Sequence, residues 1–541
     1  MGMGSKLQDA YGKIAAYMGI TYPYLALIFL LLLLAKMAYA APFSAEALKR
    51  YLYVIPLFAI PVLLKAAHEK KDALERCFPA AKVVLIFSFL LALGLRFLPY
   101  AHQDVPLGYD PGIYKYIMDR YASAIPSIPE YELPLWVRES HEQGLFLAYD
   151  ALSILGVSTD AFFRLAFPLI TAALVFPIFL LARMYFGERA AAIAALLYAL
   201  SFTQYVAYGL LYLKTAFGLL FLLIGMYAAE KKRYVLLAAS VGGLGIFHRP
   251  ELALFTLALV PYILLKRDWK LVFACAAGAV LFLPFWIPRL DAYLSIANSA
   301  VDATVENLTS QVAIGTGTFI DFTAYQFVSL VYLPFMIIGM LYLLLRREFN
   351  LLFLAALLNG IWVFAQFFFF KRFIIPLDVF AVLLAACGAE ATLMRNGAVG
   401  KAALALMLVV SAVFVYYALD SAKPLHSRAQ ISALEWIGAN AEPAAFVLST
   451  SYDAPWALGW SGRRVIAPGM FEWNLDDRQS WVEFLRSASA EDAREFLDKY
   501  NQTIYVYHSN NPGNAFNLRK FEGQCFQNLS RIGAGIYRYG C

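Results

Sequence analysis

The chain has 541 residues, of which 61% are hydrophobic and only 15% carry a charge. A soluble domain keeps about a quarter of its residues charged, so this composition excludes an ordinary soluble protein and indicates a chain embedded in lipid. Most of the residues behind the net charge of +6 lie in short loops between apolar segments rather than on one basic face, so nucleic acid is excluded as an expected partner.

Long apolar segments recur along most of the chain. A helix needs about 20 apolar residues to cross the hydrocarbon core, and by this measure we predict about thirteen transmembrane helices. In chain order they are expected near 21–42, 50–67, 80–99, 161–185, 189–207, 209–229, 233–248, 251–266, 269–288, 326–345, 349–370, 372–392 and 400–419. The fold class is therefore a polytopic α-helical membrane protein. Ala38-Tyr39-Ala40 also has the pattern of a signal-peptidase site, so the first segment is read either as a cleaved signal peptide or as a retained anchor.

Lys and Arg concentrate in every second loop, which predicts the orientation in the cell membrane. The N-terminus is expected in the cytoplasm, and the long loops 100–160 and 289–325 are expected outside, together with the C-terminal region. The basic loops hold Lys6, Lys13, Lys70, Lys71, Arg76, Lys231, Lys232, Arg233, Lys266, Arg267, Lys270, Arg346, Arg347, Arg395 and Lys401. Three Asn-x-Ser/Thr sequons, at Asn307, Asn501 and Asn528, fall on the predicted outer side.

The pattern changes after the last apolar segment, and three regions are expected. Residues 1–79 carry two spans, residues 80–420 form the main transmembrane part, and residues 421–541 form an extracytoplasmic α/β domain. In this last region helices are predicted from Ser427 and near 477–487 and 490–499, with strands at 445–448, 464–467, 504–507 and 536–539. Its only cysteines, Cys525 and Cys541, are expected to pair in a disulfide on the outer side.

The start of the first long outer loop carries two acidic residues six apart, Asp104 and Asp110. A carboxylate held at the membrane surface suits a general base or a metal ligand. Asp110 followed by Pro111 also has the pattern of a helix N-cap with proline in the first turn. Both interpretations stay open, and they do not exclude each other.

Cationic residues stand at the predicted outer ends of later spans, where lipid makes charge expensive. Lys214 lies inside a span, where it either extends to the interface or binds a phosphate. His248 and Arg249 occupy a tight outer turn before Glu251, either simply solvated or facing an anionic headgroup. Lys371 and Arg372 contradict the trend of positive charge inside, and arginine binds phosphate in a bidentate fork.

The C-terminal region gathers aromatic and acidic groups around Tyr452, Asp453 and Trp456, near Arg463, Arg464 and Glu472. Such groups suit the recognition of a sugar or a peptide. A packed interface between the domain and the membrane would have a similar composition, so this alternative stays open.

These features resemble the GT-C glycosyltransferases, which include protein O-mannosyltransferases, aminoarabinose transferases and oligosaccharyltransferase catalytic subunits. Tyr109-Asp110-Pro111 with Tyr114 is similar to the acidic and aromatic motif of their first outer loop. The segment from Ala433 to Arg464 is similar to oligosaccharyltransferase subunits, but Ser451-Tyr452-Asp453-Ala454-Pro455 replaces their Trp-Trp-Asp-Tyr-Gly motif, which puts sequon recognition in doubt. The acidic loop here follows the third span rather than the first. The resemblance covers most of residues 80–541 as architecture.

The resemblance implies transfer of a sugar from a polyprenyl-phosphate donor to a lipid, glycan or protein acceptor, among membrane lipids. Asp110 is the implied base, and Asp104 would support it or orient the acceptor. The donor phosphate would meet Arg372, assisted by Lys371, Lys214, His248 and Arg249. Acceptor or sugar contacts are assigned to Tyr109, Tyr114, Glu251, Tyr452, Asp453 and Trp456. No cofactor is certain; a divalent metal, Mg²⁺ or Mn²⁺, would use Asp110 and Asp104.

Three other functions are considered. The first is a true oligosaccharyltransferase, which moves a whole lipid-linked glycan to protein. The second is a transporter or lipid flippase, which would have internal repeats and interrupted helices with charges near the bilayer midplane. The third is a membrane-anchored binding protein, which leaves the many spans and their outer-face cations unexplained.

Overall fold

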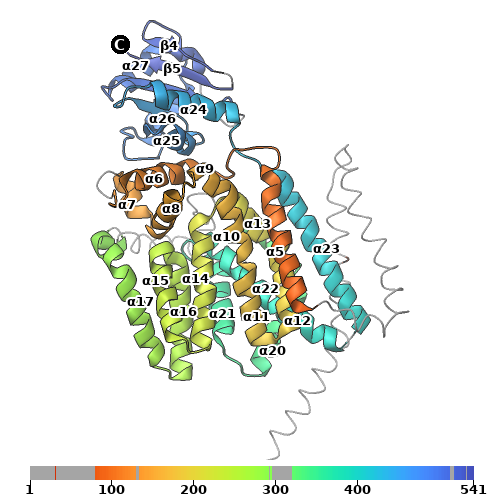
Figure 1. Cartoon of the computed structure of the whole chain (residues 1–541). Helices are drawn as coiled ribbons and strands as arrows, with labels where there is room; N and C mark the ends of the chain where they lie inside the picture. The colour runs from red at the N-terminus through yellow and green to blue at the C-terminus, as the bar shows by residue number, and fades with distance from the viewer. Residues whose placement is uncertain are drawn as a thin grey trace, which may run out of the picture.

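The computed structural model describes residue 31 and residues 80–129, 133–291, 293–294, 320–395, 397–511, 517–531 and 533–540. It is a bundle of long helices with a β-sheet and its flanking helices at one end (Figure 1). Apart from residue 31, the predicted spans at 21–42 and 50–67 lie outside the described residues, as do Asn307 and Cys541.

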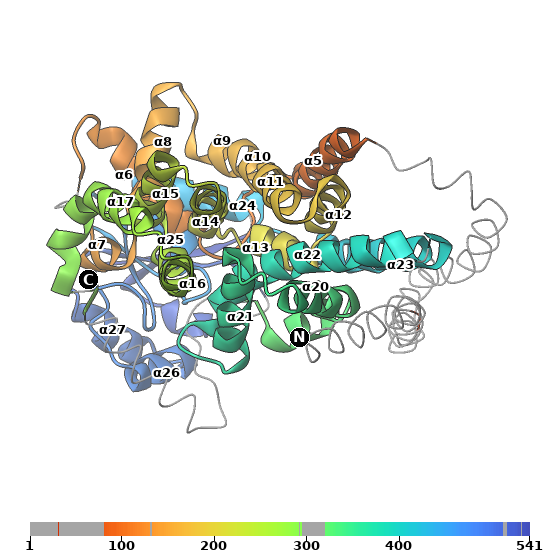
Figure 2. The same cartoon turned by 90° about the horizontal axis from the view of Figure 1, so that it is seen from below.

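Helices occupy the segments predicted as spans between residues 80 and 419. Figure 2 shows α14, α15 and α16 nearly end-on, whereas α23 runs across the view. Among the described residues, six are long and apolar enough to cross a membrane, or up to eight if each of two bent pairs is one span. The total of about thirteen stays a prediction. The helices of the bundle are α5 (Ala81–Phe97), α10 (Phe167–Ala173), α11 (Val175–Phe186), α12 (Glu188–Ala199), α13 (Phe202–Gly209), α14 (Leu213–Glu230), α15 (Tyr234–Phe247), α16 (Arg249–Lys266), α17 (Lys270–Trp286), α19 (Phe322–Ser329), α20 (Leu333–Leu345), α21 (Leu351–Phe364), α22 (Phe370–Arg395) and α23 (Gly397–Ser421).

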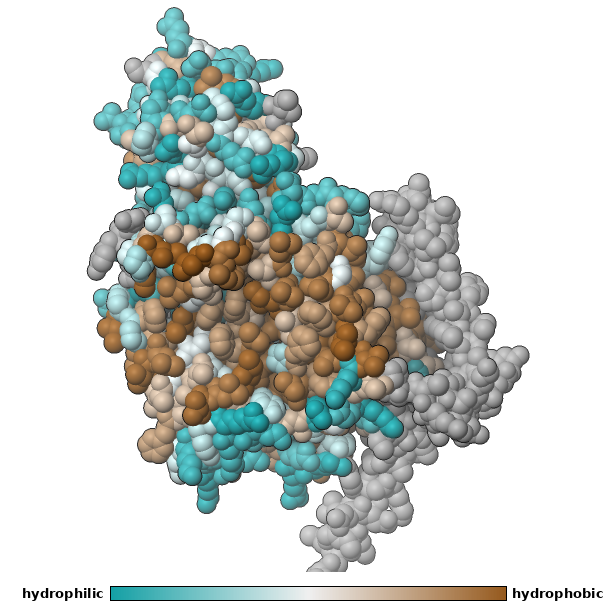
Figure 3. Space-filling model, viewed as in Figure 1, coloured by the Kyte–Doolittle hydropathy of each residue, from teal (hydrophilic) through white to brown (hydrophobic). Residues whose placement is uncertain are grey.

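The outer surface of the bundle is apolar. A hydrophobic band crosses it between hydrophilic surfaces at both ends (Figure 3). Ile86 of α5 and Phe273 and Val280 of α17 are exposed on this surface, and an apolar surface of this extent marks a contact with a membrane or with another protein. The chain is an integral membrane protein.

Two of the predicted spans are broken. The segment predicted as 189–207 is α12 and α13, which meet at 43°, and the segment predicted as 326–345 is α19 and α20, which meet at 76°. Asp378 of α22 faces the first break. Its Oδ2 accepts hydrogen bonds from Ser201 Oγ at 2.7 Å and from Gln204 Nε2 at 3.1 Å. This carboxylate binds polar groups that lipid and apolar side chains could not satisfy.

Asp378→Ala is expected to destabilise the bundle, because Ser201 Oγ–H and one N–H of Gln204 lose their buried acceptor. Each buried donor left unsatisfied costs about 1–3 kcal/mol. Thermal unfolding in detergent measures the loss. The control is Asp420→Ala, whose side chain is 82% exposed. Equal melting temperatures for the two variants would mean that the break does not depend on this carboxylate.

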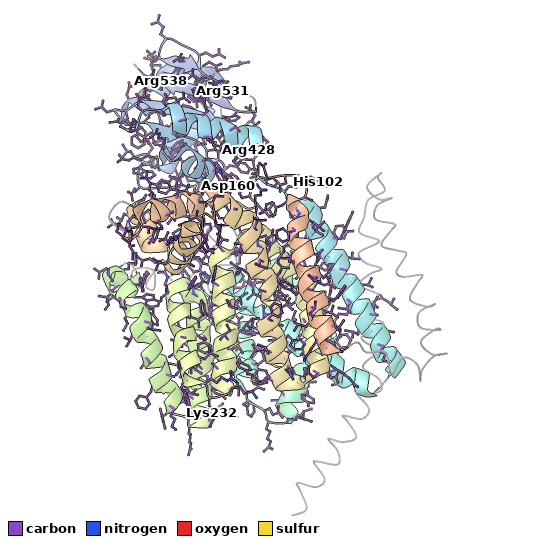
Figure 4. All side chains as sticks on the ribbon, in the orientation of Figure 1. His102, Asp160, Lys232, Arg428, Arg531 and Arg538 are labelled. Atoms are coloured by element: carbon purple, nitrogen blue, oxygen red, sulfur yellow. The ribbon has the colours of Figure 1, made fainter. Side chains whose placement is uncertain are left out.

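The two ends of the bundle differ. Figure 4 places Lys232 at the end away from the sheet, and His102 and Asp160 at the end next to it. Lys232 Nζ lies 3.3 Å from Asp268 Oδ2, so the loops after α14 and α16 meet at the far end. Shorter elements form a layer between the bundle and the sheet. They include α6 (Pro111–Ala124), α7 (Leu135–Ser140), α8 (Gly144–Ile154) and α9 (Thr159–Ala161); η1 (Leu98–Tyr100), η2 (Phe162–Ala166) and η3 (Ile287–Arg289) adjoin the ends of bundle helices.

The C-terminal region contains a five-stranded sheet in the order β2-β1-β3-β5-β4. β1 is parallel to β2 and β3, and β5 is antiparallel to β3 and β4. Phe446 and Leu448 of β1 pack with α26 and α27, whereas Val447 packs on the other face with α24 and α25. The elements are α24 (Arg428–Asn440), β1 (Phe446–Leu448), α25 (Ala454–Ser461), β2 (Arg464–Ile466), α26 (Arg478–Arg486), α27 (Ala490–Asp498), β3 (Ile504–His508), η4 (Leu518–Phe521), β4 (Phe526–Asn528) and β5 (Gly535–Tyr539).

Three elements here are not among those predicted from the sequence: α25, η4 and β4. The segment rich in Gly, Trp and Pro before β2, for which the sequence predicts no helix or strand, contains α25. Pro455 lies in the first turn of this helix, where proline is tolerated. Trp456, the next residue of the same helix, is fully buried. Cys525 is disulfide-bonded, while its predicted partner Cys541 lies outside the described residues.

Candidate active site

Asp110 lies where the bundle meets the sheet, at the start of α6. It occupies the N-cap position with Pro111 in the first turn, but its side chain makes no capping hydrogen bond. The helix therefore does not use this carboxylate as a cap.

A cavity of about 290 Å³ adjoins Asp110, within the size range of small-ligand sites. Segments far apart in the sequence build its wall: the acidic loop, the α7–α8 connection, the start of α14, the α15–α16 turn, the start of α22 and the segment after β2. The lining residues are Tyr109, Asp110, Ile113, Tyr114, His141, Leu210, Leu211, Tyr212, Lys214, Thr215, His248, Arg372 and Met470. Six of the predicted site residues are thus brought together: Tyr109, Asp110, Tyr114, Lys214, His248 and Arg372.

Asp110 shares this cavity with two cations. Burial raises the pKa of Asp110 above its usual value, while the positive charges of Arg372 and Lys214 act in the opposite direction. Burial also lowers the pKa of His141 well below its usual value, and Lys214 adds to this shift. The cavity therefore favours a neutral imidazole at His141 and a carboxylate whose proton affinity exceeds that of a solvated aspartate.

Arg372 and Lys371 are placed differently although they are neighbours. Arg372 lines the cavity, with its guanidinium carbon 5.5 Å from the centre of the Phe369 ring. Lys371 lies with its ammonium 6.0 Å from the centre of the Phe370 ring and is not among the lining residues. Successive residues of a helix point about 100° apart, so only one of the two reaches the cavity. The contact of Lys371 with the donor phosphate stays a prediction, although Lys371 is not among the residues lining the cavity.

Glu142 is a site residue that the sequence analysis missed. Its buried carboxylate accepts a hydrogen bond from Lys214 Nζ at 2.7 Å and from Arg249 Nε at 2.8 Å. Burial alone would raise the pKa of Glu142, but the charges of Lys214 and Arg249 outweigh it and hold the pKa well below its usual value. Lys214 therefore does not extend to the interface. An acidic residue in the same outer loop as Asp110 was the available signal.

Glu142→Ala is expected to destabilise the protein by about 3–5 kcal/mol, because it leaves buried Lys214 and nearby Arg249 without their counter-ion. The measurement is thermal unfolding of purified protein. Glu188→Ala is the matched control: Glu188 pairs with Arg183 at 2.6 Å, but both side chains are half exposed, so about 0–1 kcal/mol is expected. Equal losses in the two variants would contradict the central role of Glu142.

His248 reaches the cavity from the turn between α15 and α16. Its Nδ1 hydrogen-bonds Oε2 of Glu251, and such a partner fixes the orientation of the imidazole ring. Glu251 is itself only 2% exposed and does not line the cavity. Its contact with acceptor or sugar stays a prediction; in the structure its carboxylate binds His248.

Three further predicted site residues lie elsewhere. Asp104 is exposed and is not among the residues lining the cavity, and its role beside Asp110 stays a prediction. Asp453 and Trp456 are fully buried: Asp453 Oδ2 accepts a hydrogen bond from the Ser509 amide at 3.1 Å, and Trp456 stacks on Trp460 at 4.7 Å between ring centres. The predicted contact of these two with acceptor or sugar is corrected, because they belong to the core of the C-terminal region.

A second cavity of about 380 Å³ adjoins the first. Tyr109 and Leu210 line both cavities. Tyr452, the remaining predicted residue of the C-terminal region, lines the second cavity together with Ser421 and Lys423.

An apolar groove of about 800 Å³ lies along α16, with Trp286 of α17 and Leu358 of α21 on its wall. Arg249 lines one end, with its guanidinium carbon 4.1 Å from the centre of the Tyr293 ring. Since Arg249 and Lys214 bind the same carboxylate of Glu142, the end of the groove adjoins the wall of the first cavity.

The described residues do not fit a divalent metal at Asp110. They contain no group of three or more His, Cys, Asp or Glu residues that could hold a metal ion. Mg²⁺ and Mn²⁺ prefer several oxygen ligands, whereas the neighbours of Asp110 in the cavity include two cations.

One family matches part of this chain in sequence. Residues 145–290 match the family described as dolichyl-phosphate-mannose-protein mannosyltransferase. The matched segment includes Lys214 and His248. A search of curated proteins finds no match to the chain.

Solved structures share the architecture at low sequence identity. The oligosaccharyltransferase of Archaeoglobus fulgidus in its apo form is 15% identical with a TM-score of 0.55, over 79% of this chain and 69% of that chain. The same protein in complex with Zn and sulfate is 14% identical with a TM-score of 0.51, over 78% and 67%. ArnT from Cupriavidus metallidurans bound to undecaprenyl phosphate is 14% identical with a TM-score of 0.51, over 84% of this chain and 97% of that chain.

The family match and the shared architecture confirm the predicted resemblance. The solved structures named above belong to one class, the GT-C glycosyltransferases, and this chain shares their fold. The chain is an integral membrane protein with the fold of the GT-C glycosyltransferases.

Proposed function

We propose that this protein transfers a sugar from a polyprenyl-phosphate donor to an acceptor hydroxyl, at the membrane face that carries the C-terminal sheet. The observation that carries the proposal is the meeting of Asp110 with Arg372 and Lys214 in one cavity. A carboxylate takes the proton of an attacking hydroxyl, and cations stabilise a departing phosphate. Lys232 and the basic loops at the opposite end support an extracytoplasmic position for the sheet.

In the proposed reaction the acceptor oxygen attacks the anomeric carbon of the donor sugar. The bond from this carbon to the phosphate oxygen breaks, and its electron pair stays with the polyprenyl phosphate. The proton of the acceptor hydroxyl passes to Asp110. Attack opposite to the leaving group inverts the anomeric configuration.

The cations act mainly on the leaving group. Arg372 offers a planar fork that matches two phosphate oxygens. Lys214 adds a positive charge whose place is set by Glu142, and His248 lines the same wall. Negative charge on the phosphate grows as the bond breaks, so these interactions are strongest in the transition state and lower the barrier.

The apolar groove suits the isoprenoid chain of the donor. The lining of the groove is almost entirely apolar. Arg249 lies at the end of the groove next to the cavity, where the phosphate of a donor bound in the groove would be. That the ArnT structure contains undecaprenyl phosphate supports a donor of this chemical class. The second cavity suits the acceptor, because it meets the first at Tyr109; the acceptor class, lipid, glycan or protein, is left to experiment.

A transfer assay in lipid nanodiscs tests the proposal. The purified protein meets a panel of polyprenyl-phosphate monosaccharides, with and without a chelator, and release of polyprenyl phosphate is measured. Release that requires the acceptor and is lost in Asp110→Asn is the expected result. Consumption of a lipid-pyrophosphate oligosaccharide alone would establish the oligosaccharyltransferase alternative, which the Archaeoglobus fold supports. No turnover with any donor would contradict both.

A further inference from the structure

We infer that Gly459, in the C-terminal region, is a positioning residue for Asp110. The crossing of α25 over α6 sets where the carboxylate lies relative to Arg372 and Lys214. This inference rests on the proposed function, and it makes the C-terminal region part of the reaction machinery rather than an accessory to the bundle.

The first observation is how closely the two helices cross. A Cβ atom on Gly112 of α6 would lie 1.9 Å from the carbonyl oxygen of Pro455, and one on Gly459 of α25 would lie 2.4 Å from the Cα of Gly112. Figure 1 shows α25 beside α6, and the two helices are in contact. The helices therefore touch backbone to backbone, and no side chain stands between them that could absorb a displacement.

The second observation is that this contact lies next to the reactive group. Gly112 is two residues after Asp110, on the first turn of the helix that Asp110 begins. A shift of α25 is therefore passed to Asp110 through a short, rigid piece of backbone. Interiors packed at this density transmit strain rather than absorb it.

The third observation concerns the other side of Asp110. The hydroxyl of Tyr109 donates a hydrogen bond to the carbonyl oxygen of Ser451 and lies 3.5 Å from Met470 Sδ. Met470 itself lines the cavity. Asp110 is thus held on both sides, at Tyr109 and at Gly112, by residues of the C-terminal region.

A purely structural role is the alternative, because glycines at a helix crossing also serve packing alone. The chain offers a matched case. At the crossing of α20 and α22, a Cβ on Gly339 would lie 2.0 Å from the carbonyl oxygen of Leu384. This crossing is about as tight as the crossing of α6 and α25. Neither Gly339 nor Leu384 lines the cavity that contains Asp110.

The experiment compares Gly459→Ala with Gly339→Ala and with Gly360→Ala, whose Cβ would meet nothing within 4 Å. Sugar transfer is measured as a function of pH and normalised to folded protein. Gly459→Ala is expected to lower kcat by about 10²-fold, as misplacement of a reacting group does, and to leave the donor KM nearly unchanged. It is also expected to shift the midpoint of the acidic limb of the pH–rate profile, the pH range in which the rate rises as Asp110 loses its proton. Gly339→Ala is expected to lower the melting temperature and to leave kcat and this midpoint unchanged, and Gly360→Ala to change neither.

Several results would overturn the inference. One is a wild-type kcat and pH midpoint in Gly459→Ala, and another is the same change in Gly339→Ala. If Gly459→Ala does not fold, Tyr109→Phe is the alternative variant, because it removes the hydrogen bond from Tyr109 to the Ser451 carbonyl oxygen without adding atoms. It is expected to lower kcat at constant donor KM, and an unchanged kcat would overturn the inference. A wild-type protein that transfers no sugar would overturn the proposed function, and this inference with it.

Discussion

Asp110→Asn is expected to lower the rate of sugar transfer by about 10²–10⁴-fold, the range contributed by a positioned general base. The amide has nearly the same shape as the carboxylate but cannot accept the proton of the acceptor hydroxyl. Since the Asp110 side chain makes no capping hydrogen bond, the melting temperature is expected to change little. The measurement is the rate of polyprenyl phosphate release, with the exposed Asp420→Asn as the control.

The dependence of the rate on pH gives an independent check on Asp110. A base acts in its ionised form, so kcat/KM should rise as the pH rises through the pKa of Asp110. Burial raises this pKa above the ordinary value of 3.8, so the midpoint of the acidic limb is expected above pH 3.8. The limb should be absent from the residual activity of Asp110→Asn. A variant that keeps the limb and the rate, and loses only thermal stability, would show that Asp110 acts as a helix residue alone.

Arg372→Ala is expected to lower kcat by about 10²–10³-fold, the usual effect of removing one donor that stabilises developing charge. The guanidinium lies in the cavity with Asp110, where low dielectric makes its charge effective. Arg372→Lys should restore only part of the rate, because lysine keeps the charge but lacks the bidentate fork.

An arginine outside the cavity serves as a control, because it distinguishes the loss of any positive charge from the loss of the charge at position 372. Arg346, after α20, is half exposed, and its guanidinium carbon lies 4.3 Å from the centre of the Tyr342 ring. Arg346→Ala is expected to transfer sugar at the wild-type rate. Should Arg372→Ala raise only the donor KM at constant kcat, Arg372 would bind donor and transition state equally, and its proposed role in stabilising the leaving group would be wrong.

Part of the site could be predicted from the sequence, because charged residues within apolar segments are unusual in a membrane protein. A lysine within an apolar span, or two cations between phenylalanines, is costly unless it serves a purpose, and Lys214 and Arg372 do line the cavity. The pattern could not tell Arg372 from Lys371, because the choice depends on where the first turn of α22 faces. It also could not tell a binding surface from a core, and Asp453 and Trp456 are buried.

The partners of these residues could not be predicted in the same way. Glu142 binds Lys214, 72 residues away, and Arg249, 107 residues away, and no local pattern specifies such pairs. The two broken spans were missed for a similar reason. Their residues are apolar enough for straight helices, and the bend at Ser201 is stabilised by Asp378 from another helix.

The sequence by itself determined the elements and their environment: apolar segments that only lipid can solvate, and an α/β pattern after residue 427. Both follow from local composition and periodicity, since the hydrophobic effect and backbone hydrogen bonding act on each segment directly. Only the tertiary structure decided which charges share a cavity, and that a crossing of α6 and α25 lies beside Asp110. Contacts between segments hundreds of residues apart depend on packing and on desolvated ion pairs, whose energies exist only once the chain has folded.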